Sequence, residues 1–170
     1  LNHRGEPGPE TVFGRPTPLS FGVFVTPDPK QNPIDPPERF TGYHVGLDME
    51  VSKEELEEDV PVYAVCDGDV LFSGFADGYG GLVTQRCELS GEPVTILYGH
   101  LATEGLPETG TSLETGTAFA VLGEHRTHDT DGGRKHLHLG IHRGEGDADV
   151  RGYVQTEEEI GLFLDPAEVL

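Results

Sequence analysis

The sequence has few of the residues that build membrane spans, cysteine-rich scaffolds or basic surfaces. It contains two Cys, one Met and no Trp, and no run of 18 or more apolar residues. This excludes a membrane-spanning helix. No secretory signal is visible at the N-terminus. Lys and Arg together number 11 against 31 Asp and Glu, so the net charge is −20 with His neutral. Such a surface repels nucleic acid and anionic membranes.

The two cysteines, Cys66 and Cys87, are the only thiols in the chain. Their spacing of 21 residues matches no zinc-binding motif. They are expected to form one disulfide if the protein is exported, or otherwise to remain as two buried thiols. Neither is expected to be catalytic.

What the chain has in abundance is Gly (24) and Pro (13), which favour strands and turns over long helices. A length of 170 residues fits one domain. Residues 1–18 are rich in Gly, Pro and charge, and are interpreted as a linker or N-terminal arm. The domain is expected to cover 19–170, with a proline-rich loop at 26–38.

Short strand-like segments follow one another closely, and this predicts a mainly β fold with an antiparallel sandwich or barrel-like sheet. The expected strands are 21–25, part of 40–51, 61–66, 69–75, 81–88, 93–98, 117–122 and 136–142. Helical turns are expected at 52–59, where Ser52 and Glu55 can form a capping box. A helix or two, interrupted by Pro166, are expected within 156–169.

The segment from His136 to His142 has a pattern that points to chemistry. Side chains alternate between the two faces of a strand, so Leu137, Leu139 and Ile141 are expected to point into a core. His136, His138 and His142 then share the opposite face. One imidazole can bind a metal there while a second lies nearby; the other interpretation is a solvated polar face on an edge strand.

Two further segments carry histidines. His44 and Asp48 are four residues apart, and four residues of straight strand span about 13 Å, so the chain must bend for both to reach one ion. Gly46 permits such a bend. His100 follows the apolar segment 95–98 at a turn, where a single His usually has a structural role.

Taken together, these residues favour a catalytic metal site. Two His and one Asp leave one coordination position of a zinc ion open, as in a catalytic site rather than a closed structural one. Two more His are then free to transfer protons near neutral pH.

The order of these motifs resembles the lysostaphin and LytM-type zinc endopeptidases, which cut cell-wall peptides. The family pattern is HxxxD, then a single His after an apolar strand, then HxH. Other phrases also look like the family, namely PVYAVCDGDV, the Gly78-Tyr79-Gly80 turn, TILYGHL and the closing FLDPAEVL. The resemblance covers about residues 16–170.

This resemblance implies one Zn²⁺ bound by His44, Asp48 and His138, with His100 and His136 as catalytic histidines. One would accept the proton of the attacking water and the other would stabilise the oxyanion, in either order. It also implies a duplicated-hybrid-motif β fold and a peptidoglycan peptide substrate. The location would be extracellular, periplasmic or in the cell envelope. The bond that is cut and the oligomeric state stay open.

The sequence departs from the family before the HxH motif, where a polar loop, 124–135, carries extra histidines. Arg134 and Lys135 in this loop are predicted to contact a carboxylate of the substrate; the alternative is pairing with Asp129 or Asp131. Two other functions stay open. One is a non-catalytic binding or regulatory module, and the other is a zinc amidase or carboxypeptidase acting on a related wall substrate.

Overall fold

The computed structural model describes residues 19–33, 37–145 and 150–170, and the arm expected at 1–18 lies outside them. The strands are β1 (Phe24–Val25), β2 (Gly42–His44), β3 (Leu47–Glu50), β4 (Pro61–Tyr63), β5 (Gly68–Ala76), β6 (Gly80–Leu89), β7 (Glu92–Leu101), β8 (Ser112–Leu113), β9 (Ala118–Val121), β10 (His136–Arg143) and β11 (Tyr153–Val154). The helices are η1 (Glu55–Glu57), η2 (His128–Thr130), α1 (Glu157–Ile160) and α2 (Pro166–Val169). The predicted mainly β fold is confirmed.

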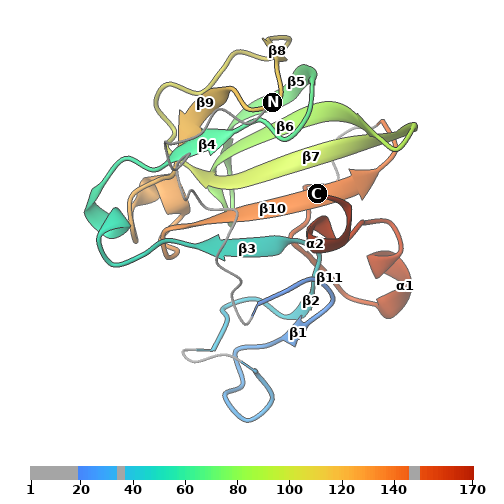
Figure 1. Ribbon diagram of the computed structural model, residues 1–170. Helices are drawn as coiled ribbons and strands as arrows, with labels where there is room; N and C mark the ends of the chain where they lie inside the picture. Colours follow the sequence, from blue (N-terminus) through green and yellow to red (C-terminus); the bar gives the residue numbers. More distant parts are fainter. Residues whose placement is uncertain (1–18, 34–36, 146–149) are drawn as a thin grey trace, which may run out of the picture.

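Six strands form the main sheet in the order β3-β10-β7-β6-β5-β8, and every pairing in it is antiparallel. A small sheet, β1-β2-β11, lies beyond the β3 edge, and a β4-β9 ribbon lies near the other side of the sheet (Figure 1). Strand β10, next to the edge strand, pairs with β3 on one side and β7 on the other. Asp48, His100, His136 and His138 therefore lie on neighbouring strands, and His44 ends β2 in the small sheet.

One face of β10 packs into the core, as the alternation of side chains predicted. Leu137, Leu139 and Ile141 are fully buried among apolar residues of β4, β6 and β7. Tyr98 lies in the same core, where its hydroxyl donates to the side-chain oxygen of Gln85 and accepts from the Val65 amide. The buried hydroxyl of Tyr98 is thus satisfied as both donor and acceptor. The histidines of β10 point to the opposite face.

The structure refines several expected elements. Segment 40–51 is two strands in two different sheets, because the chain turns between His44 and Leu47. The helical turns expected at 52–59 shorten to the single 3-10 turn η1, although Ser52 and Glu55 do exchange the two hydrogen bonds of a capping box. Strands β8 and β11 were not expected, because each has only two residues. Pro166 begins the second of the two predicted helices. No helix among the described residues is long and apolar enough to cross a membrane.

Cys66 and Cys87 form a disulfide that joins the β4–β5 turn to β6, which decides between the two alternatives left by the sequence. The bond closes a loop over a sequence separation of 21 residues. Reduction should therefore lower the free energy of unfolding by about 3 kcal/mol, mainly because the unfolded chain gains freedom. Urea unfolding with and without reductant measures this. The Cys66→Ala/Cys87→Ala double variant is the control and should not respond to reductant; an equal response from both proteins would contradict the prediction.

Candidate metal centre

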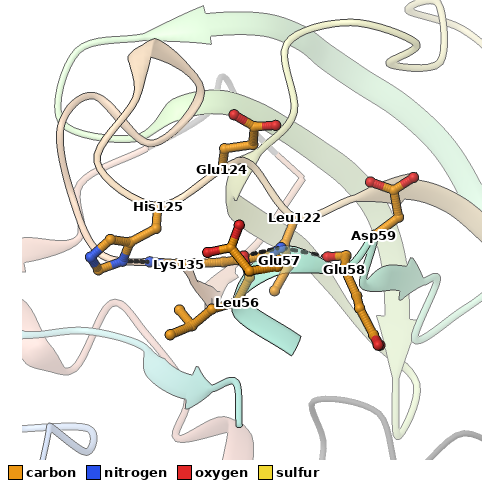
Figure 2. Close-up of a pocket in the computed structure, with 8 residues that line it drawn as sticks. All are labelled: Leu56, Glu57, Glu58, Asp59, Leu122, Glu124, His125 and Lys135. Atoms are coloured by element: carbon orange, nitrogen blue, oxygen red, sulfur yellow. Dashed lines mark hydrogen bonds between the residues drawn. The ribbon is translucent and has the colours of Figure 1, made fainter. Parts of the chain in front are cut away.

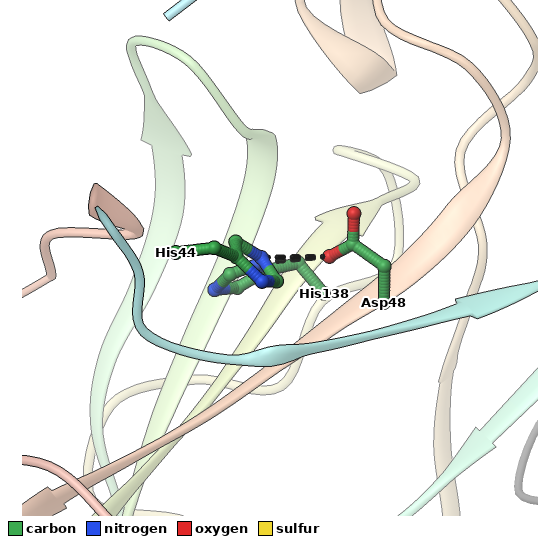
Figure 3. Close-up of side chains that lie close together, drawn as sticks. All are labelled: His44, Asp48 and His138. Atoms are coloured by element: carbon green, nitrogen blue, oxygen red, sulfur yellow. Dashed lines mark hydrogen bonds and ion pairs between the residues drawn. The ribbon is translucent and has the colours of Figure 1, made fainter. Parts of the chain in front are cut away.

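Three side chains from three strand segments meet in one buried cluster. His44 ends β2, Asp48 lies in β3 and His138 lies in β10, directly opposite Asp48 in the strand pairing. His44 Nε2 lies 3.2 Å from Asp48 Oδ1 and 3.0 Å from His138 Nδ1, and His138 Nδ1 lies 2.9 Å from the same Asp48 oxygen. Figure 3 shows the two rings and the carboxylate pointing toward one another. The structure thus brings together the three residues expected to bind the metal.

The bend expected at Gly46 is what allows this meeting. A Cβ atom on Gly46 would lie 2.5 Å from His138 Cε1 and 2.6 Å from its Nε2, closer than van der Waals contact permits. Glycine is therefore needed because the imidazole of His138 packs directly on the backbone. Its φ is not in the left-handed region, so close approach is the requirement here rather than backbone conformation.

The donor atoms fit a divalent metal. A tetrahedral zinc ion about 2.0–2.1 Å from each donor keeps the donors about 3.3 Å apart, close to the separations found here. Each of the three residues directs one potential ligand atom toward the other two, as donors to a single cation do. His44 Nδ1 donates to the carbonyl of Ser20 at 3.2 Å, which leaves its Nε2 free to bind a metal. These residues can therefore hold a metal ion.

Electrostatics favours the metal-binding protonation states. Burial lowers the pKa of His138 to about 4, so its ring is neutral at neutral pH. Burial raises the pKa of Asp48, but the neighbouring His136 and His44 and the bonds from His136 and His138 outweigh it and hold the pKa well below its usual range. A carboxylate and neutral imidazoles are the forms in which these residues bind metals.

The two histidines expected to be catalytic lie beside this cluster. The ring centroids of His100 and His136 are 4.3 Å apart, and His136 Nε2 lies 3.2 Å from Asp48 Oδ2. His100 Nδ1 donates to the carbonyl of Tyr79, and His136 Nδ1 to that of Arg134, both at 2.9 Å. Each ring therefore leaves Nε2 for other partners. Burial, with help from neighbouring imidazoles, holds the pKa of His100 well below its usual value.

Arg134 and Lys135 have partners inside the protein. Arg134 donates to Asp48 at 2.7 Å and to Glu50 at 2.8 Å, rather than pairing with Asp129 or Asp131 as one alternative expected. Lys135 is buried, and its Nζ donates to the carbonyls of Leu56 and Glu58, in the latter case at 2.6 Å. Figure 2 shows it within a pocket lined by acidic side chains. The substrate contact predicted for these two residues stays a prediction.

The other histidines within the described part of the chain lie outside the cluster. His125 accepts a bond from the Lys135 amide, His128 stacks on Phe75, and His142 contacts the ring of Phe163. Sequence reasoning missed the acceptors that orient the site, because they are backbone carbonyls and carry no signature in the residue type. It also missed Tyr153, which pairs with His44 from β11 and whose ring lies 5.3 Å from the His44 ring.

Comparisons with known proteins concern the family and the fold of this chain. Residues 42–150 match the model of peptidase family M23. In structure, the chain is similar to the catalytic domain of the antimicrobial peptidase lysostaphin from Staphylococcus simulans, with a TM-score of 0.55 and 16% identity over 88% of this chain and 86% of that one. It is also similar to LytU, with a TM-score of 0.54 and 20% identity over 100% of this chain and 98% of that one.

At these identities the two structural likenesses establish the fold alone. Among curated proteins, none matches the chain significantly in sequence. The match to the family model covers well over half of the 170 residues and includes His44, Asp48, His100, His136 and His138. The chain therefore belongs to peptidase family M23.

Proposed function

We propose that this protein is a zinc-dependent endopeptidase that hydrolyses peptide bonds in bacterial peptidoglycan. The observation that carries the proposal is the convergence of His44 Nε2, Asp48 Oδ1 and His138 Nδ1 within 3.2 Å, next to two further imidazoles, in a chain of a peptidase family. Two His and one carboxylate are a ligand set of hydrolytic zinc sites with an open position. The likeness to lysostaphin, a peptidase described as antimicrobial, supports a cell-wall substrate.

In the proposed mechanism, the bound metal would polarise the scissile carbonyl and activate water. The residues of the chain position and move protons around it. His44 is oriented by the Ser20 carbonyl and His100 by the Tyr79 carbonyl, so both rings are held before substrate arrives. The Nε2 atoms of His100 and His136 are available to accept the proton of the attacking water and to pass it to the leaving amine. A protonated imidazole beside the carbonyl would stabilise the oxyanion.

The disulfide of the protein supports action outside the cytoplasm. A disulfide persists in oxidising compartments, which agrees with an extracellular, periplasmic or cell-envelope location. The net charge of −20 disfavours nucleic acid as a partner. We therefore propose peptidoglycan peptide as the substrate.

Digestion of purified peptidoglycan by the zinc-loaded protein tests the proposal. Mass spectrometry of the soluble products should reveal new amino termini inside the stem peptide or cross-bridge, and a chelator should stop their release until zinc is restored. Intact stem peptides freed from glycan would indicate an amidase, and release of single terminal amino acids a carboxypeptidase. Absence of any product at full zinc occupancy would favour a binding module and contradict the proposal.

A further inference from the structure

The two oxygens of Asp48 have different partners. Oδ1 faces the metal-binding cluster, at 3.2 Å from His44 Nε2 and 2.9 Å from His138 Nδ1. Oδ2 faces the other way, at 2.7 Å from Arg134 Nη2 and 3.2 Å from His136 Nε2. The carboxylate is thus divided between the metal site and a guanidinium, and only one of its oxygens is turned toward the other two donors.

Arg134 is the group that holds Oδ2. His136 Nδ1 donates to the carbonyl of Arg134, so a bond from its Nε2 to Oδ2, at 3.2 Å, needs a second proton on the ring, whereas the guanidinium of Arg134 always carries its protons. The bond from Arg134 is short and charge-assisted, which makes it strong and directional.

The guanidinium is itself fixed in place. Its Nε donates to Glu50 at 2.8 Å, and Nη1 lies 3.9 Å from Glu38. Three carboxylates from two segments therefore surround one cation, and its side chain is only about one-third exposed. Because the backbone carbonyl of Arg134 also orients His136, one residue fixes a metal ligand and a catalytic imidazole together.

We propose that Arg134 is a positioning residue that makes Asp48 a one-oxygen metal ligand. The inference rests on the proposed metal site. Carboxylates bind metals through one oxygen or two, and a second oxygen would occupy the position that a hydrolytic site leaves open for water and substrate. By holding Oδ2 away, Arg134 keeps the coordination number low. Neighbours of this kind, outside the ligands themselves, are known to orient ligands and tune metal sites.

The sequence predicted a different role for Arg134, namely contact with a carboxylate of the substrate. A guanidinium already surrounded by Glu38, Asp48 and Glu50 has little attraction left for a further carboxylate. The two roles differ in what they affect. A substrate contact changes KM and leaves the metal unchanged, whereas a positioning role changes the metal itself in the absence of substrate.

Cobalt substitution provides the readout, because four-coordinate Co²⁺ absorbs visible light more strongly than five-coordinate Co²⁺. The Arg134→Ala and Arg134→Met variants have no side-chain donor at position 134 and should show a clearly weaker visible band at full Co²⁺ occupancy. The Arg134→Lys and Arg134→Gln variants can still donate one hydrogen bond to Oδ2 and should restore the band. Arg143→Ala is the matched control. Arg143 ends β10, the strand that follows Arg134, and its Nε donates to the carbonyl of Gly161, so the band of this variant should equal that of the unaltered protein.

Circular dichroism shows whether Arg134→Ala and Arg134→Met are folded. If one of these two donor-free variants is unfolded, the other is enough to test the inference. A band of full strength in the donor-free variant would overturn the inference, as would a weak band in all four Arg134 variants. A raised KM with an unchanged band would assign Arg134 to the substrate instead. If the unaltered protein binds Co²⁺ but cleaves no peptidoglycan, the proposed function fails while the inference on Arg134 stands. If it binds no metal, both fail.

Discussion

Replacing His138 with alanine is expected to abolish stoichiometric zinc binding and to lower kcat/KM on peptidoglycan by at least about a thousandfold. His138 supplies one of the three converging donors. Without it, two of the three, Asp48 and His44, would remain to hold the metal. A metal contributes several kcal/mol to hydrolysis, and each 1.36 kcal/mol corresponds to about a factor of ten in rate. Elemental analysis after dialysis gives the zinc content, and the digestion assay gives the rate.

His142→Ala is the matched control for this variant. His142 lies on the same strand and the same face as His138, but it contacts the ring of Phe163 instead of the metal-binding cluster. Its alanine variant should keep one zinc per chain. Normal zinc content in His138→Ala would refute the assignment, and loss of zinc in both variants would show that the strand, rather than the ligand, had been damaged.

The structure brings together His44, Asp48 and His138, the three residues that the family resemblance of the HxxxD and HxH motifs implied as metal ligands. Alternation along β10 separates core leucines from histidines, and zinc chemistry restricts which residue types can pair with them. The fold class followed from closely spaced strands and turns. The bend at Gly46 was predictable because a straight strand keeps His44 and Asp48 too far apart. The fold class and the bend need only local spacing and the chemistry of single residues, whereas the selection of three ligands among the histidines and carboxylates also needed the family resemblance.

What the sequence did not predict depends on long-range packing. The partners of Arg134 are 84 and 86 residues away along the chain, and its charge alone does not distinguish a ligand-holding role from a substrate contact. The carbonyls of Ser20 and Tyr79 orient imidazoles through backbone atoms that every residue type has. The two-residue strand β11 is too short to show a pattern, yet it places Tyr153 beside His44. Orientation of the site is thus a property of the fold.

His100 provides the complementary experiment, in which the metal stays and the chemistry is lost. His100→Ala should retain one zinc per chain, because the ring is not part of the metal-binding cluster. Its activity should fall by about 10²–10⁴-fold, the usual contribution of a positioned proton-transfer group. Zinc analysis and the digestion assay on the same sample measure both quantities.

Backbone conformation complicates the alanine variant, because His100 has a φ of 64°, in the left-handed region that alanine adopts less readily than asparagine. His100→Asn is therefore the sharper variant. Asparagine tolerates this φ and its amide can still donate to the Tyr79 carbonyl, but it cannot accept a proton near neutral pH. Both variants should be equally inactive if proton transfer is the role of His100. If His100→Asn keeps full activity while His100→Ala loses it, the imidazole serves only to hold the Tyr79 turn, and His136 remains as the proton-transfer residue.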